Sequence, residues 1–290
     1  MKLAKMATTH TKESSFNFLI LINFTETSYK ALDYLIKLVK VVGGKIEIYC
    51  IIDPFSIADN DNQVTALRSI QTEKRRVERK LNSIVEMIEL EGIKACSSYS
   101  IGNLKSELKL KLRQAKPDIV VMGKGRGVTN WILNYLINEY KESVLILGNE
   151  SDFLTGNKIT IGYNSKTFDQ YNFQLVSKFS QASEIPLTLL KVISPLEKED
   201  AITMSNIPPV SDQTDLYFRF EYQSSSNVAS ALLENTSSGN VELLCIGRSK
   251  DKHSFFRHLF SNSTTFKIAK NIKIPLLIMS RKNETKTKDV

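Results

Sequence analysis

Short apolar runs alternate with longer segments of helical periodicity along most of this chain. The run FNFLILIN at 16–23 is continuously apolar, as is typical of a parallel strand covered on both faces. The next segment, 25–42, carries its apolar residues at helical spacing and is followed by a Gly-Gly pair, a common helix terminator. Because strand and helix patterns continue to alternate, the sequence predicts a parallel sheet with right-handed crossovers and helices on both faces.

This order of strands and helices occurs twice. The strands expected in the first half are 16–23, 45–52, 94–101, 118–123 and 143–148. Those expected in the second half are 158–164, 186–193, 215–222, 241–247 and 274–280. A period of about 140 residues is longer than the roughly 20–50 residues of solenoid repeats, so it indicates a duplicated domain. The predicted fold class is α/β, with two tandem doubly wound, Rossmann-related domains at 16–150 and 157–281 and disordered tails at 1–15 and 282–290.

The two halves are expected to differ in two connections. Between the second and third strands, the first half has a charged helical segment at about 62–91. The second half has at the same point a proline-containing loop at 194–214. The connection from the fourth strand to the fifth spans 20 residues after Gly123 in the first half and 27 residues after Gly247 in the second half. The first half is therefore expected to lack most of a loop at this point.

The net charge of +8 is spread along the chain of 290 residues. Residues 1–150 contain 22 Lys and Arg against 17 Asp and Glu, and the remainder contains 17 against 14. The densest basic run, EKRRVERK at 73–80, alternates with glutamates on an expected helix, which favours a solvated helix face over a nucleic-acid surface. Nucleic acid is therefore not the expected partner, and a salt-dependent affinity for it would show otherwise.

Cysteine and histidine usage gives no sign of a disulfide framework or a metal site. Cys50, Cys96 and Cys245 form no C-x-x-C pair, which favours a reducing compartment. His253 and His258 are interpreted as part of a solvated helix start. No apolar run approaches the ~20 residues of a membrane span, and the N-terminus lacks the apolar region of a secretory signal. These features predict a cytoplasmic protein without a membrane partner.

Several motifs together resemble the universal stress protein family. They are a first strand that ends in a polar residue, a hydroxyl-capped helix, IIDP closing the second strand and VVMG closing the fourth. A last helix leads into a short apolar strand in both halves, so the chain resembles a tandem member of the family over 16–150 and 157–281. The resemblance implies that the two domains pair within one chain through their last strands, SVLILG and IPLLIMS. It also makes a homodimer of tandem chains a further expectation, with no protein partner identified.

In family members that bind ATP, the first strand ends in Asp and a Gly-x-x-Gly-x(9)-Gly-Ser/Thr signature follows the fourth strand. Glycines allow backbone N–H groups to approach phosphates, and a hydroxyl at a helix N-terminus adds a donor. This chain departs from both features. Asn23 and Asn164 occupy the Asp positions, where an amide can pair with an adenine edge but supplies no charge.

The candidate phosphate loops are also altered. In the second half Gly247 matches the first glycine, Lys250 replaces the second, and Asn262-Ser263, with Thr264 next, falls on the Gly-Ser/Thr position. The charge of Arg248, Lys250 and Lys252 could still attract an anion to this loop.

In the first half Gly123, Gly125 and Gly127 have the spacing Gly-x-Gly-x-Gly, without the Gly-Ser/Thr that would complete the signature. A tight turn explains them more simply, with left-handed backbone angles at Gly125 and Gly127. Thr25 and Ile52 complete the candidate nucleotide-binding residues. Trp131 has two interpretations, a side chain filling the nucleotide space or a residue of interdomain packing.

No catalytic motif is found, since the chain has no Gly-x-Ser-x-Gly elbow, Walker lysine loop or His-Glu-x-x-His helix. The leading hypothesis is a non-enzymatic stress-response module for binding or signalling, with degenerate nucleotide sites and no certain cofactor. The main alternative is a nucleotide-binding stress sensor that retains one ATP site and hydrolyses ATP slowly. An enzyme of the wider nucleotide-binding α/β group would need a positioned base or nucleophile.

Overall fold

The computed structural model describes residues 15–54, 63–125, 130–148, 150–162, 174–193, 218–238, 240–248 and 262–280. The first half contains β1 (Phe16–Leu21), α1 (Glu26–Val42), β2 (Gly44–Ile52), α3 (Gln63–Leu90), β3 (Lys94–Ile101), α4 (Leu104–Ala115), β4 (Ile119–Gly123), α5 (Asn130–Asn138) and β5 (Ser143–Leu147). The second half contains β6 (Lys158–Gly162), α6 (Gln174–Ser183), β7 (Leu187–Ile193), β8 (Phe218–Ser224), α7 (Val228–Ser238), β9 (Val241–Gly247), α8 (Asn262–Asn271) and β10 (Leu276–Met279). The expected loop at 194–214 and nearly all of both expected tails lie outside the described residues.

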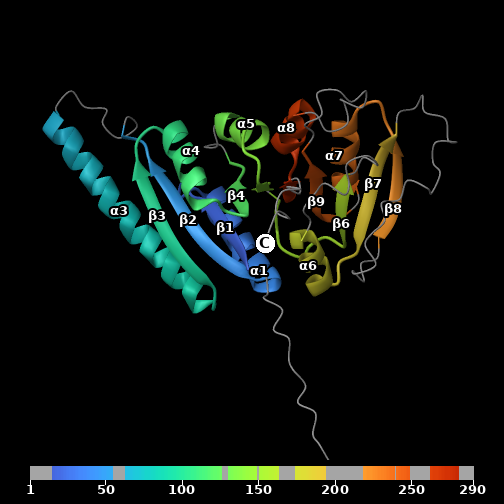
Figure 1. Ribbon diagram of the computed structural model, residues 1–290, viewed down its shortest axis with the longest axis horizontal. Helices are drawn as coiled ribbons and strands as arrows, with labels where there is room; N and C mark the ends of the chain where they lie inside the picture. Colours follow the sequence, from blue (N-terminus) through green and yellow to red (C-terminus); the bar gives the residue numbers. More distant parts are fainter. Residues whose placement is uncertain are drawn as a thin grey trace, which may run out of the picture.

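The ten strands of the described residues form one sheet in the order β3-β2-β1-β4-β5-β10-β9-β6-β7-β8 (Figure 1). Every neighbouring pair is parallel except the central pair, β5 and β10, which is antiparallel. The order of the second half is therefore the mirror of the first, as in two copies related by a pseudo-twofold axis. This confirms the α/β doubly wound class, while the domain boundaries at 150 and 157 stay a prediction.

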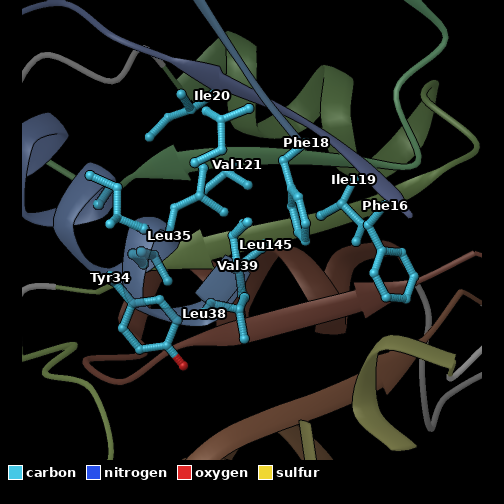
Figure 2. Close-up of a cluster of buried hydrophobic side chains, with 14 of the residues drawn as sticks. Phe16, Phe18, Ile20, Tyr34, Leu35, Leu38, Val39, Ile119, Val121 and Leu145 are labelled. Atoms are coloured by element: carbon cyan, nitrogen blue, oxygen red, sulfur yellow. The ribbon is translucent and has the colours of Figure 1, made fainter. Parts of the chain in front are cut away.

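Alternation of side chains along the strands creates a core on each side of the sheet. Phe18 and Ile20 of β1 belong to the cluster covered by α1, α3 and α6, whereas Leu19 belongs to the cluster covered by α4, α5, α7 and α8. Both faces are therefore buried, which explains the continuous apolar runs in the sequence. Figure 2 shows how Leu35 and Val39 of α1 lie against β1, β4 and β5 on the first of these faces.

Strand pairing and helix packing join the halves. Val144 and Ile146 of β5 pair with Ile278 and Leu276 of β10, so the expected pairing of the last strands is confirmed. Helix α1 packs on α6 on one face of the sheet, and α5 packs on α8 on the other (Figure 1). Within the described ranges, none of the helices combines the length and apolar character needed to cross a bilayer.

The connection between the halves is packed into this junction. The Phe153 ring lies edge-on to Tyr34 of α1, with 5.2 Å between centroids, and 5.7 Å from the Phe179 ring of α6. Glu242, the second residue of β9, is 1% exposed and accepts the backbone N–H groups of Leu154 and Gly156 at 3.0 and 2.8 Å. The connecting segment is therefore held by both halves.

Candidate functional site

A cavity of about 90 Å³ lies at the carboxyl ends of β1, β2 and β4, where open α/β sheets bind ligands. The residues that line it include Asn23, Ser28, Ile51, Leu104, Gly123 and Ile132. Pockets for drug-sized ligands usually measure roughly 300–1,000 Å³. The volume of the cavity within the described residues is therefore well below that of usual ligand pockets.

Asn23 faces this cavity, but its amide oxygen is already used. The Thr25 hydroxyl donates to Asn23 Oδ1 at 2.6 Å, and the Thr25 backbone N–H reaches the same oxygen at 3.4 Å. Thr25 occupies the N-cap position of α1, yet its side chain makes no capping hydrogen bond to the helix. With Oδ1 engaged, Asn23 offers a ligand mainly the N–H donors of its amide.

Phe24, between these two residues, adopts a left-handed backbone conformation with φ of 57°. This conformation is unfavourable for a bulky side chain and requires support from its surroundings. Helix α3 supplies it, because Lys80 Nζ lies 4.9 Å and the Arg76 guanidinium 6.0 Å from the centre of the Phe24 ring. The turn that presents Asn23 is therefore fixed by α3.

Gly123 and Gly125 are required by close packing against the first turn of α1. A Cβ at Gly123 would lie 2.3 Å from the Thr27 carbonyl oxygen, and one at Gly125 would lie 2.1 Å from Thr27 Oγ1. The predicted left-handed angle at Gly125 is wrong, because its φ is not positive. The glycine allows the chain to approach Thr27 closely, a contact that the sequence pattern does not reveal. Gly127 lies outside the described residues.

Ile52 is buried on the other side of the sheet from the cavity. Its side chain joins the core under α1 and α3, whereas the preceding residue, Ile51, lines the cavity. Because side chains alternate along a strand, a shift of one residue exchanges the two faces. The sequence motif identified the end of the strand correctly but not the side chain that faces the site.

In the second half, the structure describes only part of the candidate site. Gly247 is the last residue of β9 and is buried, and Asn262, Ser263 and Thr264 form the first turn of α8. Asn164, Lys250 and Lys252 lie outside the described residues.

Arg248, which follows Gly247 directly, lies at the junction of the halves. It is 6% exposed, and its guanidinium donates to the carbonyl oxygens of Leu136, Ile137 and Glu142 in the first half. Burial lowers the pKa of this guanidinium to about 10, so it stays charged at neutral pH. The expected contribution of Arg248 to an anion site is therefore replaced by a contact between the halves.

Lys124 occupies the equivalent position in the first half, directly after Gly123. Its ammonium donates to the carbonyl oxygens of Lys270, at 2.8 Å, and Ile272 at the end of α8. Burial lowers its pKa. Sequence reasoning missed this pair, although a glycine followed by a cation at the end of the fourth strand of both halves was a visible signal.

Trp131 stacks on Tyr135 of the same helix, with 5.3 Å between ring centres and 6° between planes. Lys105 and Lys109 of α4 place their ammonium groups 5.5 and 5.9 Å from the centre of the indole. These ring contacts lie within the first half, and Ile132 rather than Trp131 lines the cavity.

The described residues contain no group of three or more His, Cys, Asp and Glu side chains arranged to hold a metal ion. The three cysteines are free thiols. Burial raises the pKa of Cys50 to about 11 and that of Cys245 further, so both are protonated at neutral pH and chemically unreactive.

No family model and no curated protein matches the sequence. Solved structures with a similar fold are found, among them a universal stress protein from Archaeoglobus fulgidus. It aligns over 92% of this chain and 97% of its own, with 16% identity and a TM-score of 0.67. A functionally unknown protein from Pseudomonas aeruginosa aligns over 92% and 93% of the two chains, with 9% identity and a TM-score of 0.53.

The cytoplasmic domain of a prokaryotic cation chloride cotransporter also aligns over 92% of this chain and 95% of its own, with 11% identity and a TM-score of 0.50. These alignments run across both halves of the sheet. The chain therefore has the universal-stress-protein-like fold over nearly its whole length.

Proposed function

We propose that this protein is a non-enzymatic module of the stress response that acts in the cytoplasm by binding or signalling. In this proposal its nucleotide sites are degenerate and serve as structural parts of a scaffold. The fold supports the class of protein, and the chemistry of the carboxyl edge supports the loss of nucleotide binding. The absence of a recognisable catalytic motif from the sequence supports a non-enzymatic role.

One observation carries the proposal, namely the packing of Gly123 and Gly125 onto Thr27. To use the N-terminus of α1, a phosphate would have to approach this same first turn. The backbone at 123–125 already packs closely on Thr27, and the neighbouring cavity of about 90 Å³ is smaller than usual ligand pockets. The cations at the fourth-strand ends, Lys124 and Arg248, are engaged by backbone carbonyls.

A nucleotide-binding stress sensor is the second candidate, with slow ATP hydrolysis as its extreme form. It is favoured by the position of the cavity at the carboxyl edge and by the amide of Asn23 at its wall. The side-chain N–H donors of Asn23 could pair with a ring nitrogen of adenine.

Calorimetry with Mg-ATP, together with mass spectrometry of any nucleotide that copurifies, separates the two candidates. The scaffold proposal expects no copurified nucleotide and no binding heat up to millimolar ATP. Binding that is abolished by Asn23→Ala, but not by Asn134→Ala on the exposed face of α5, would instead establish the sensor. ATP turnover above background would refute the non-enzymatic assignment.

The state of assembly is a separate part of the proposal. The pairing of β5 with β10 satisfies within one chain the strand edges that would otherwise attract a second subunit. Further association of tandem chains into a homodimer would use another surface, and light scattering across a range of concentrations tests it.

A further inference from the structure

A groove of about 880 Å³ lies between the C-terminal parts of α4 and α5. Its walls include Asp118, just before β4, and Glu142, just before β5. It is therefore at the amino edge of the first half of the sheet, away from the Asn23 cavity at the carboxyl edge. Its volume is in the range of known ligand sites.

Charged side chains line this groove, and three of its cations have no ionic partner among the described residues. Lys109 pairs with Glu139 at 3.0 Å, which leaves Arg113, Lys116 and Lys141. Across the described part of the chain, none of these three forms an ion pair.

The remaining carboxylates do not offset these cations fully. One oxygen of Asp118 accepts the backbone N–H of Asn17 at 2.8 Å, so this carboxylate is held at the strand end. Glu142 is the other carboxylate of the lining. The groove therefore has an excess of positive charge that a ligand can complement.

The floor and rim of the groove have the composition of a protein-binding surface. Leu112, Pro117 and Tyr135 form the floor of the lining and are largely covered by their own surroundings, with Leu112 3% and Tyr135 7% exposed, whereas Trp131, which stacks on Tyr135, is partly exposed. Tryptophan, tyrosine and arginine are the residues enriched at the energetic centres of protein interfaces. This combination fits a ligand that carries both negative charge and apolar side chains.

The groove wall is also held in place. Arg248 binds the carbonyl oxygens of Leu136, Ile137 and Glu142, and the Tyr140 hydroxyl donates to the Pro117 carbonyl at 3.4 Å. A site that is already ordered before binding loses less entropy when the ligand arrives.

We propose that the α4–α5 groove docks an acidic peptide segment of a partner protein, with apolar side chains of the segment beside the partly exposed Trp131 ring at the end of the Leu112–Pro117–Tyr135 floor. Nucleic acid fits less well, because carboxylates are interspersed among the cations and would lie close to a continuous phosphate backbone. This inference goes beyond the proposed function and is independent of whether the Asn23 cavity binds a nucleotide.

A purely structural role is the competing explanation of the cations. Arg113 lies in the last turn of α4 and Lys116 caps the helix, so both complement the negative end of its dipole. That role predicts a change of stability when the charges are reversed, but no effect on binding by a folded protein.

The test measures fluorescence anisotropy of a short fluorescein-labelled peptide, made of glutamate pairs separated by leucines, at low salt. Binding to the wild type is expected, with a change in the emission of Trp131, the only tryptophan of the chain. The double variant Arg113→Glu/Lys116→Glu should weaken binding by roughly tenfold or more. Lys141→Glu is a second variant, and Arg75→Glu, on the exposed face of α3, is the matched control.

Circular dichroism melting verifies that each variant is folded before its affinity is compared. The proposal is overturned if the wild type does not bind the peptide, or if Arg75→Glu weakens binding as much as the groove variants. It is also overturned if an oligonucleotide of the same charge binds more tightly than the peptide. A loss confined to the groove variants, with Arg75→Glu within about twofold of the wild type, supports it.

Discussion

The guanidinium of Arg248 donates through Nη1 to the carbonyl oxygen of Leu136 at 2.9 Å, across the junction of the two halves. The same nitrogen reaches the Ile137 carbonyl at 2.7 Å, and Nη2 reaches that of Glu142 at 2.9 Å. Leu136 and Ile137 are near the end of α5, where unsatisfied carbonyls and the helix dipole attract a cation. Arg248 therefore caps a helix of the opposite half.

Lys124 makes the reciprocal contact with the end of α8. In each half, the cation that follows the fourth strand thus binds backbone carbonyls at the end of the last helix of the other half. Because α5 and α8 also pack on each other, both cations act on one junction. In this fold, residues adjacent to the candidate phosphate loops stabilise the pairing of the halves.

Replacement of Arg248 by methionine should destabilise the protein by about 3 kcal/mol, because buried carbonyls lose charged donors and methionine offers none. Arg248→Lys should lose less, since it keeps a charge but cannot form the planar fork. Urea unfolding followed by circular dichroism measures both changes. The exposed Arg75→Met is the control, and an equal loss in it would contradict the role given to Arg248.

Gly123 and Gly125 both pack on Thr27, so a substitution of Thr27 should recover part of the stability that is lost when Gly125 is replaced. Gly125→Ala should lose about 1–3 kcal/mol, because the new methyl meets the Thr27 side chain. Adding Thr27→Ala should recover part of that loss by removing Oγ1 and Cγ2. Gly123→Ala should be at least as destabilising without recovery, because the atom in its way is the Thr27 backbone carbonyl. Denaturant midpoints of the single and double variants provide the test.

If the double variant Thr27→Ala/Gly125→Ala were no more stable than Gly125→Ala alone, the glycine would be required for another reason. A role in holding a phosphate would then need to be reconsidered.

Gly92→Ala measures the cost of backbone conformation without a packing clash, because Gly92 has φ of 78° and a methyl group added there would meet no atom within 4 Å. Its loss should be about 1 kcal/mol from backbone strain alone.

The general architecture could be predicted from the sequence because it depends on periodicity. Continuous apolar runs such as 16–23 identify strands buried on both faces, and their repetition after about 140 residues identifies the duplication. The partners of individual side chains could not be predicted this way. Arg248 resembled an anion ligand because its neighbours in sequence are a glycine and lysines, but its partners are more than a hundred residues away.

The same limit applies to the candidate site. The position of Asn23 at the carboxyl edge follows from strand order, and in the structure Asn23 lies at that edge, in the cavity wall. Gly125 and Ile52 were proposed as nucleotide-binding residues from their positions in sequence motifs alone. Their surroundings depend on the approach of α1 and on which face of β2 a side chain occupies, and both are tertiary properties.

Glu242 should be sensitive to loss of its charge, although it is far from any candidate site. Its carboxylate accepts the backbone N–H groups of Leu154 and Gly156 and the Tyr34 hydroxyl. In Glu242→Gln the amide nitrogen would face one of these donors, so we expect a loss of about 3 kcal/mol in the free energy of unfolding. Glu234→Gln, at an exposed position of α7, is the matched control and should change stability by less than about 0.5 kcal/mol.

The partner of Glu242, Tyr34, gives a prediction about alkaline pH. Burial, followed by the charge and hydrogen bond of Glu242, raises the pKa of the Tyr34 hydroxyl well above its ordinary value of 10.0. The native state therefore retains this proton at pH values where the unfolded chain loses it. The resulting stabilisation is complete below 10.0 and is lost as the pH rises from there toward the folded pKa.

Tyr34→Phe should remove this dependence. Near neutral pH the variant should lose at most about 1 kcal/mol, because Glu242 keeps two backbone donors. Above the ordinary tyrosine pKa, the free energy of unfolding of the variant should fall less steeply with pH than that of the wild type. The difference between the two slopes should correspond to the uptake or release of up to one proton per molecule. Urea unfolding in buffers on both sides of 10.0 measures the two slopes. Parallel slopes would mean that Tyr34 ionises in the folded protein as readily as in the unfolded chain. Tyr222→Phe, at an exposed position of β8, is the matched control.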